Sequence, residues 1–272
     1  MACPGFPVFG CHIVSVKKGV EFMPACYFCT TVGNDYYLGL EPYMELTGLA
    51  YQITPFRSRD GQPRINTEKM YNNMMNKFRY GNVKAHGIYL DENTMRMCDT
   101  HRYMFTQLAE QLTRENKLDS AVAVLTRCDA ELPSYNVPYT GYYAYMMCRA
   151  YLNVADKLMK AGRDEEAEQM VNQAVTIAEN LCRNIAEYSD YVFSLSKDHL
   201  TQIDLDDIGN KAQIAYYAYA TCQSSTEYLT GRRGYGNETF DNLARTRFDD
   251  RVKTEYVDKL MKLLDKIDND RD

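Results

Sequence analysis

Two segments of the chain share one spacing of large and small residues, and this spacing restricts the fold more than any other feature of the sequence. Small residues flank a turn in each segment: Ala109 and Ala121 in the first, Ala155 and Ala167 in the second. Small residues at such positions let the two helices of a hairpin approach closely, while large residues fill the space around them. The first set is Phe105, Leu108, Ala109, Leu112, Ala121, Leu125, Cys128 and Pro133, and the second is Tyr151, Val154, Ala155, Leu158, Ala167, Val171, Ala174 and Glu179.

This spacing is that of the tetratricopeptide repeat, and only Glu179 departs from it, at the position of a terminal proline. We therefore expect a mostly α protein, with tetratricopeptide-like helical hairpins stacked into a short α-solenoid and a small N-terminal β element. The predicted hairpins pair 93–115 with 119–131 and 142–161 with 164–178. Further helices at 207–230 and 238–267 are predicted to form a third, degenerate hairpin that caps the stack.

Two short regions precede the helices. Residues 1–21 lack periodicity and are punctuated by Pro and Gly, which predicts an irregular leader. Residues 22–65 are predicted to form a small β or extended element, because 25–32 and 49–56 are rich in β-branched and aromatic residues. We expect these two strands to pair antiparallel and to pack on the first helices, since an isolated two-stranded hairpin is only marginally stable. The helical repeat domain then spans 66–272.

Charge and hydropathy exclude several classes of function. The chain has 31 Lys and Arg against 37 Asp and Glu, a formal net charge of −6, whereas nucleic-acid-binding domains usually carry a basic footprint. We expect no nucleic-acid partner. No stretch offers the roughly 20 consecutive apolar residues of a membrane-spanning helix, so the chain is not expected to span a membrane. Lys17 and Lys18 follow the uncharged residues 1–16, which is the wrong polarity for a signal peptide.

The nine cysteines and four histidines are scattered, and the sequence predicts no metal site and no cofactor. Two thiol arrangements offer an alternative function, that of a small thiol-dependent enzyme or redox protein. Cys26 and Cys29 form a CxxC motif, but in a predicted strand, where positions i and i+3 face opposite sides. Cys98 and His101 share a helix face. For this pair the structural alternative is a buried thiol beside a hydrogen-bonded imidazole.

The predicted hairpins define a candidate binding surface. In tetratricopeptide arrays the first helix of each hairpin lines a concave groove, and the positions on that face that packing does not use are available to a partner. These positions are Tyr103, Thr106, Glu110 and Arg114 in the first unit and Arg149, Asp156 and Lys160 in the second. We expect this mixed-charge surface, with Tyr103 as a stacking platform, to bind a protein or glycoprotein segment. Alternatively, helices at 66–79 or 207–230 fill the groove.

Tyrosine-rich runs at 135–145 and 216–219 leave two interpretations open. Tyrosine is large and amphipathic, so such runs suit either helix packing or a surface that contacts a glycan or peptide.

A family resemblance is carried by five segments, namely 27–40, 46–55, 66–78, 89–98 and 135–138. Together they resemble the C-terminal soluble region of the bacterial protein O-mannosyltransferase-like membrane proteins. The resemblance implies a tetratricopeptide-like tail that lies outside the cytoplasmic membrane, in the periplasm. It also implies that any glycosyl transfer belongs to a membrane half that this sequence lacks, so that no catalytic residue carries over. On this resemblance the chain is a non-enzymatic interaction module, and the membrane half is a second candidate partner.

Overall fold

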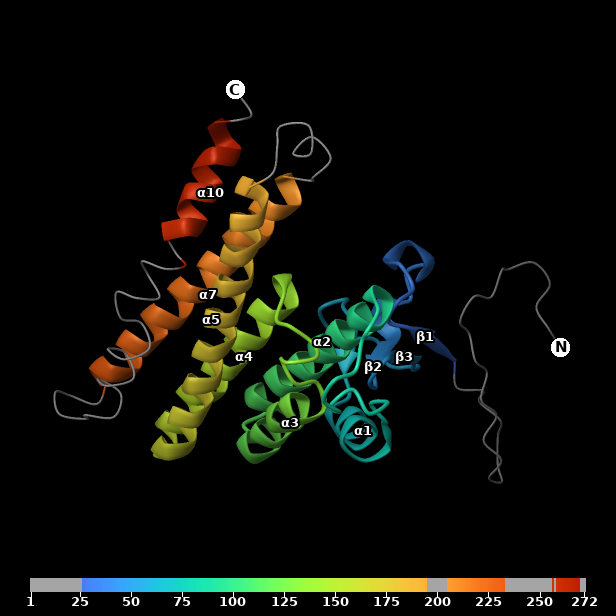
Figure 1. The fold of residues 1–272 in the computed structure, drawn as a ribbon. Coiled ribbons are helices and arrows are strands. Elements are labelled where there is room, and N and C mark those ends of the chain that lie inside the picture. The colour runs from blue at the N-terminus through green and yellow to red at the C-terminus, as the bar shows by residue number, and fades with distance from the viewer. Residues whose placement is uncertain (1–25, 195–204, 233–255, 257, 270–272) are drawn as a thin grey trace, which may run out of the picture. The chain divides into compact units, whose positions relative to one another are not determined.

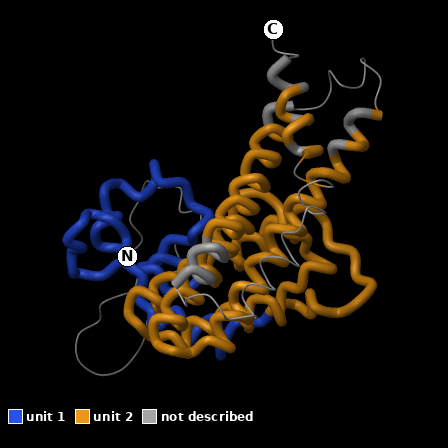
Figure 2. Tube along the Cα trace, turned by 90° about the vertical axis from the view of Figure 1, so that its left-hand side faces the viewer, with its two compact units in different colours: residues 1–79 blue, residues 80–272 orange. Residues whose placement is uncertain are grey.

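A computed structural model describes residues 26–194, 205–232, 256 and 258–269. The chain forms two compact units, residues 1–79 and residues 80–272, which are coloured separately in Figure 2. It is mostly helical, with a small sheet near the N-terminus, as the sequence predicted (Figure 1). The predicted leader at 1–21 and most of the predicted helix at 238–267 lie outside the residues described.

The sheet of the first unit has four short strands in the order β1-β3-β2-β4. Strand β1 (Tyr27–Cys29) pairs antiparallel with β3 (Ala50–Ile53), which confirms the predicted pairing of 25–32 with 49–56. Strand β2 (Met44–Leu46) pairs antiparallel with β3 and parallel with β4 (Arg64–Ile65). Strands β2 and β4 were not predicted, because two or three residues are too few to show an alternating pattern.

The first helix of the chain belongs to the same compact unit as the sheet. Helix α1 (Thr67–Asn72) begins after Asn66, whose Oδ1 accepts a hydrogen bond from the Lys69 backbone N–H at 3.0 Å and so caps the first turn. The predicted helix over 66–79 is confirmed over 67–77, but only its first part is α-helical, because after Asn72 the chain continues as a π-helical turn, η3 (Asn73–Lys77). The division of the sequence at 65/66 placed this helix in the helical domain, whereas the compact unit extends to Arg79.

The second unit is built from helices that pack on their neighbours (Figure 1). Helix α2 (Glu92–Arg114) packs on α3 (Leu118–Glu131), and α4 (Gly141–Lys160) packs on α5 (Asp164–Ser194). Helix α4 also packs on α2. Helix α7 (Leu205–Arg232) packs on α4 and α5, and α10 (Asp258–Asn269) packs on α7 and α5.

The small residues of the repeated spacing lie in the core of this unit. Ala109, Ala121, Ala155 and Ala167 are all fully buried, so the predicted burial of Ala109 and Ala155 is confirmed. Helix α5 continues beyond 178, the end of the segment predicted to pair in the hairpin, because its apolar stripe continues through Leu181 to Ile185, both of which are buried.

Three cysteines from α4, α5 and α7 lie in the same core. The sulfur atoms of Cys148 and Cys222 are 3.1 Å apart, although the two residues are 74 positions apart in the sequence. The Cys182 thiol donates to the Ala215 carbonyl oxygen at 3.5 Å. All three thiols are buried, so these cysteines serve as small core residues.

The loop between α3 and α4 is held by a buried arginine. The Arg102 guanidinium donates to the backbone carbonyl oxygens of Leu132 at 2.9 Å and Pro138 at 3.1 Å, and also to that of Val137. It lies over the Tyr139 ring, 4.4 Å from its centroid. Arg102 therefore satisfies loop carbonyl groups that would otherwise be buried without donors.

Candidate functional site

The predicted binding residues lie on α2 and α4, two helices that pack against each other. Arg114, Arg149 and Lys160 are exposed, whereas Tyr103, Glu110 and Asp156 are half-buried. Six of the seven predicted residues are therefore open to solvent at least in part. Helix α7, one of the elements that could have filled the groove, packs on α4 and α5.

Thr106 is the exception, and its assignment to the binding surface is wrong. The residue is fully buried, and its hydroxyl donates to the Arg102 backbone carbonyl oxygen at 2.9 Å. Helix α2 packs on both α3 and α4, so its buried stripe is wider than the face that a single neighbour would cover. The width of that stripe depends on tertiary contacts and could not be obtained from the spacing alone.

A tyrosine cluster, formed by Tyr103, Tyr142, Tyr143 and Tyr145, joins the two helices at this surface. The ring centroids of Tyr103 on α2 and Tyr143 on α4 are 4.9 Å apart. Tyr142 lies 6.4 Å from Tyr143 and 6.3 Å from Tyr145, and the Arg149 guanidinium stands 5.8 Å from the Tyr145 centroid. Tyr142 and Tyr143 are 53% and 41% exposed, so their rings are available for contact with a partner.

The rings of the cluster differ in burial, because Tyr103 is half-buried whereas Tyr142 and Tyr143 are exposed. Burial, followed by the nearby Tyr143 hydroxyl, raises the pKa of Tyr103, so its phenol stays neutral well above physiological pH. Tyr103 thus supplies the packed base of the cluster, and Tyr142 supplies its exposed rim. Within the tyrosine-rich run at 135–145, Tyr139 is buried and belongs to the core.

The charged residues of the surface are paired within their own helices. Glu110 and Arg114 on α2 are 3.6 Å apart, and Asp156 and Lys160 on α4 are also in contact. Both pairs have the i, i+4 spacing, which adds little stability at an exposed position. Helices α2 and α4 therefore carry charges that balance within each pair, in addition to the tyrosine cluster, a composition that suits a polypeptide segment better than a highly charged ligand.

The Cys98–His101 candidate lies in an environment that opposes thiolate chemistry. Desolvation by burial raises the pKa of Cys98 and lowers the pKa of His101. A thiolate–imidazolium pair requires the opposite shifts. Cys29 lies in strand β1 with Cys26 just before it, so the CxxC motif has extended backbone and does not open a helix.

Asp129, Tyr139 and Tyr151 form a buried polar network that joins the loop at 132–140 to the helices. The Asp129 carboxylate accepts hydrogen bonds from the hydroxyls of Tyr139, at 3.3 Å, and Tyr151. Burial raises the pKa of Asp129, against the lowering effect of these two donors and of Arg102. Because Tyr139 and Tyr151 are almost completely buried, the network braces the helices and the loop and offers no surface to a substrate.

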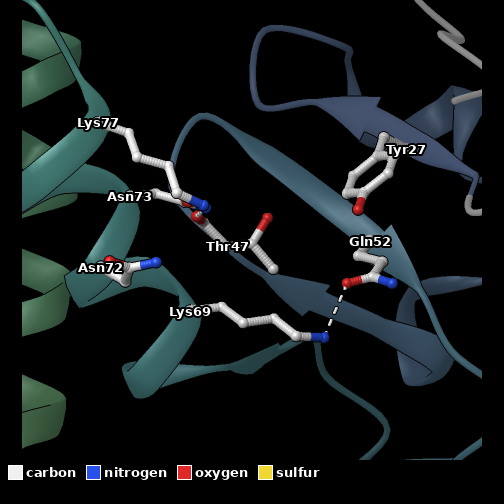
Figure 3. A pocket seen from close by; sticks show the side chains of 7 residues that line it. All are labelled: Tyr27, Thr47, Gln52, Lys69, Asn72, Asn73 and Lys77. Carbon is white, nitrogen blue, oxygen red and sulfur yellow. Dashed lines mark hydrogen bonds between the residues drawn. The ribbon is translucent and has the colours of Figure 1, made fainter. Parts of the chain in front are cut away.

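A cleft in the first unit was missed by the sequence reasoning (Figure 3). Its lining residues are Tyr27, Thr47, Gln52, Lys69, Asn72, Asn73 and Lys77. The signal that could have revealed it is the four-residue recurrence of Lys69, Asn73 and Lys77, which places the three polar side chains along one side of the first helix, next to the buried Met70 and Met74.

Neither a family model, nor a curated protein, nor a solved structure matches this chain. In the part of the chain that the structure describes, no three His, Cys, Asp or Glu residues come together in an arrangement that could hold a metal ion. None of the helices described combines the length and the apolarity that crossing a bilayer requires.

Proposed function

We propose that this chain is a non-enzymatic protein-interaction module, and that its α2–α4 surface binds an extended polypeptide segment of a partner. The observation that carries the proposal is the tyrosine cluster, in which residues of two different helices meet and leave the Tyr142 and Tyr143 rings exposed. Tyrosine provides a large, rigid contact area at a low cost in conformational entropy, which is why it is enriched at binding surfaces.

The order of helix contacts supports a tetratricopeptide-like array as the framework. In such an array each first helix packs on its own partner helix and on the first helix of the next hairpin. Helix α4 packs on α5 and also on α2 and α7, and α7 packs on α5 as the first helix of a following hairpin would. A short array offers a short groove, so an affinity on the order of micromolar is expected.

The partner is proposed from the resemblance of the five segments to the O-mannosyltransferase-like family. On that basis the segment would come from the membrane half of such a protein or from a glycoprotein, outside the cytoplasmic membrane. Fractionation of cells into periplasm, membrane and cytoplasm tests the location directly, and recovery of the chain in the cytoplasm alone would contradict it.

The test of the surface is capture from detergent-solubilised membranes with the full chain, followed by an affinity measurement with the captured partner. The double variant Tyr142→Ser/Tyr143→Ser removes the exposed rings and is expected to weaken binding about tenfold or more. Tyr191→Ser is a matched control, because Tyr191 on α5 is 55% exposed, close to the 53% of Tyr142.

Charge reversal provides a second, independent comparison. Arg114→Glu and Lys160→Glu each replace the exposed base of an intrahelical pair whose acid is half-buried, so the folding of each variant is checked by circular dichroism before a loss of binding is assigned to the surface. Binding that is equally strong in the double tyrosine variant and in both charge reversals would place the interaction elsewhere and reject the proposal.

A further inference from the structure

We propose that the cleft of the first unit is a binding site for a small anion that also carries hydroxyl groups, the chemistry shared by sugar phosphates and sugar carboxylates. This site is separate from the α2–α4 surface, and the proposal does not depend on the proposed function. The cavity has a volume of about 330 Å³, which is within the range of small-molecule sites.

The sheet forms one wall of this cleft. Tyr27 on β1 lies directly opposite Gln52 on β3, so their side chains project from the same face of the sheet. Thr47, just after β2, contributes a third side chain. Figure 3 shows Tyr27 and Gln52 directed toward the space that the helical wall faces.

Helix α1 and the π-helical turn form the other wall and are tied to the sheet by hydrogen bonds. The Lys69 ammonium donates to Gln52 Oε1 at 3.1 Å. The Asn73 amide donates to the Thr47 carbonyl oxygen at 2.7 Å, while its Oδ1 accepts from the Lys77 ammonium at 3.1 Å. The turn therefore fixes Asn73 against the sheet and positions Lys77 at the cleft, and π-helical turns of this kind recur at functional sites.

The charge of the cleft is positive and not compensated within it. Two of its seven lining residues are lysines, and none is acidic. Among the residues described, both ammonium groups have neutral amide oxygens as their partners and neither lies within 4.0 Å of a carboxylate. Glu45 shares the Gln52 face by register, but it is already bound by Arg64 at 2.9 Å and by the Asn66 amide at 3.1 Å.

These groups select the class of ligand. Two ammonium groups attract a phosphate or carboxylate, and they are the only charged groups of the lining. The amides of Gln52, Asn72 and Asn73 donate and accept hydrogen bonds, as the hydroxyl groups of a sugar require. Figure 3 shows the Asn72 nitrogen turned toward the cleft. An apolar ligand would bury these polar groups without partners, which opposes its binding.

The experiment titrates the full chain with four probes at low ionic strength and follows binding by calorimetry and by backbone amide NMR shifts. The probes are glucose 6-phosphate, glucuronate, inorganic phosphate and neutral glucose. Glucose 6-phosphate or glucuronate is expected to bind more tightly than inorganic phosphate, with shifts confined to the two walls of the cleft. Whichever of the two binds more tightly identifies the anionic group.

Two variants test the role of the lysines. Lys69→Gln and Lys77→Gln are each expected to weaken binding of the sugar anion about tenfold. Arg59→Gln is the matched control, because it removes the same charge from the same unit. Arg59 is exposed and does not line the cleft. An equal loss in Arg59→Gln would indicate attraction by net charge alone and would overturn the site.

A third variant tests recognition of the hydroxyl groups. Asn72→Ala changes an exposed helix position to a good helix former, so the fold is expected to be kept. The variant is expected to have a lower affinity for glucose 6-phosphate and an unchanged affinity for inorganic phosphate. Equal affinity of the unmodified chain for glucose 6-phosphate and inorganic phosphate would reject recognition of the sugar. If neither sugar anion binds at concentrations up to about the millimolar range, the site is rejected.

Discussion

At the scale of single residues, Arg102 shows how an inserted loop is kept in place. Its side chain is about 1% exposed and contacts three backbone carbonyl groups, the Tyr139 ring and, at 3.6 Å, the Asp99 carboxylate. A buried guanidinium is tolerated when most of its donors find acceptors. The loop at 132–140 supplies acceptors to both terminal nitrogens of Arg102, whereas its Nε has no hydrogen-bond partner among the described residues, so the residue and the loop stabilise each other through the terminal nitrogens.

Replacing this arginine is expected to be among the most damaging single changes. Arg102→Met keeps much of the volume but leaves buried carbonyl groups without a donor, so the free energy of unfolding should fall by about 3–5 kcal/mol. Urea unfolding followed by circular dichroism measures the change. Arg96→Met on the same helix is the control, because Arg96 is largely exposed and should change stability by no more than about 0.5 kcal/mol. Similar losses in both variants would contradict this role.

His101 is expected to make the stability of the fold depend on pH. Burial lowers its pKa in the folded chain, while the unfolded chain keeps the usual value near 6.5. The unfolded state therefore binds more protons as the pH falls below about 6.5, so stability is present above that pH and is lost below it.

The comparison that checks this prediction uses His101→Phe. Phenylalanine keeps an aromatic ring beside Tyr80, whose centroid is 5.5 Å from that of His101, but it does not titrate. The urea midpoint should therefore change less between about pH 7 and pH 5 in the variant than in the unmodified chain. The same slope in both proteins would show that other groups cause the dependence.

At the scale of elements, the helices of the second unit were predicted better than any other part of the structure. Their spacing of large and small residues is local in sequence and agrees with the packing that it specifies, as for Ala109 and Ala155. The burial of Thr106 and the carbonyl contacts of Arg102 were not predictable, because both depend on neighbours distant in the sequence. The cleft was missed for a similar reason, since it requires the register of β3 as well as the face of α1.

The close approach of α2 to its neighbours can be tested by overpacking. Ala109→Leu inserts three extra carbon atoms into a position with no exposed surface and is expected to lower the free energy of unfolding by about 1–3 kcal/mol. Ala130→Leu on α3 provides the control, because Ala130 is exposed and both residue types favour a helix. Chemical denaturation measures the free energy of unfolding of both variants. An unchanged free energy of unfolding in Ala109→Leu would contradict the close packing of the helices at this position.

At the scale of the whole molecule, the helices of the second unit pack both on helices next to them in the chain, as α4 does on α5, and on more distant ones, as α4 does on α2 and α7. The contact of Cys148 with Cys222 belongs to the second kind, because it joins positions 74 residues apart, on α4 and on α7. Any covalent bond at this point would connect the middle of the unit to its C-terminal part and would restrict the unfolded chain far more than a local link could.

Refolding in the presence of a mild oxidant is therefore expected to stabilise the second unit, because in the folded chain both thiols are buried and the pKa of Cys222 is raised. A low-molecular-weight disulfide can accept the electrons of both thiols in two exchange steps, leaving Cys148 bonded to Cys222 and releasing two small thiols. Closing a loop of this length should add about 4 kcal/mol to the free energy of unfolding. Thermal unfolding with and without a reductant measures the gain, and Cys222→Ser should abolish it, whereas Cys128→Ser should not. Equal melting temperatures in both conditions would contradict the prediction.

Because these two sulfurs lie far apart along the chain, a bond between them makes the stability of the folded molecule depend on the redox conditions under which it folded. A thiol pair at 3.1 Å can record the redox potential of the compartment in which the chain folds, because a bond formed there is afterwards enclosed by three helices. Two samples with one amino-acid sequence would then differ in resistance to heat and to proteases according to their history, long after that environment has changed.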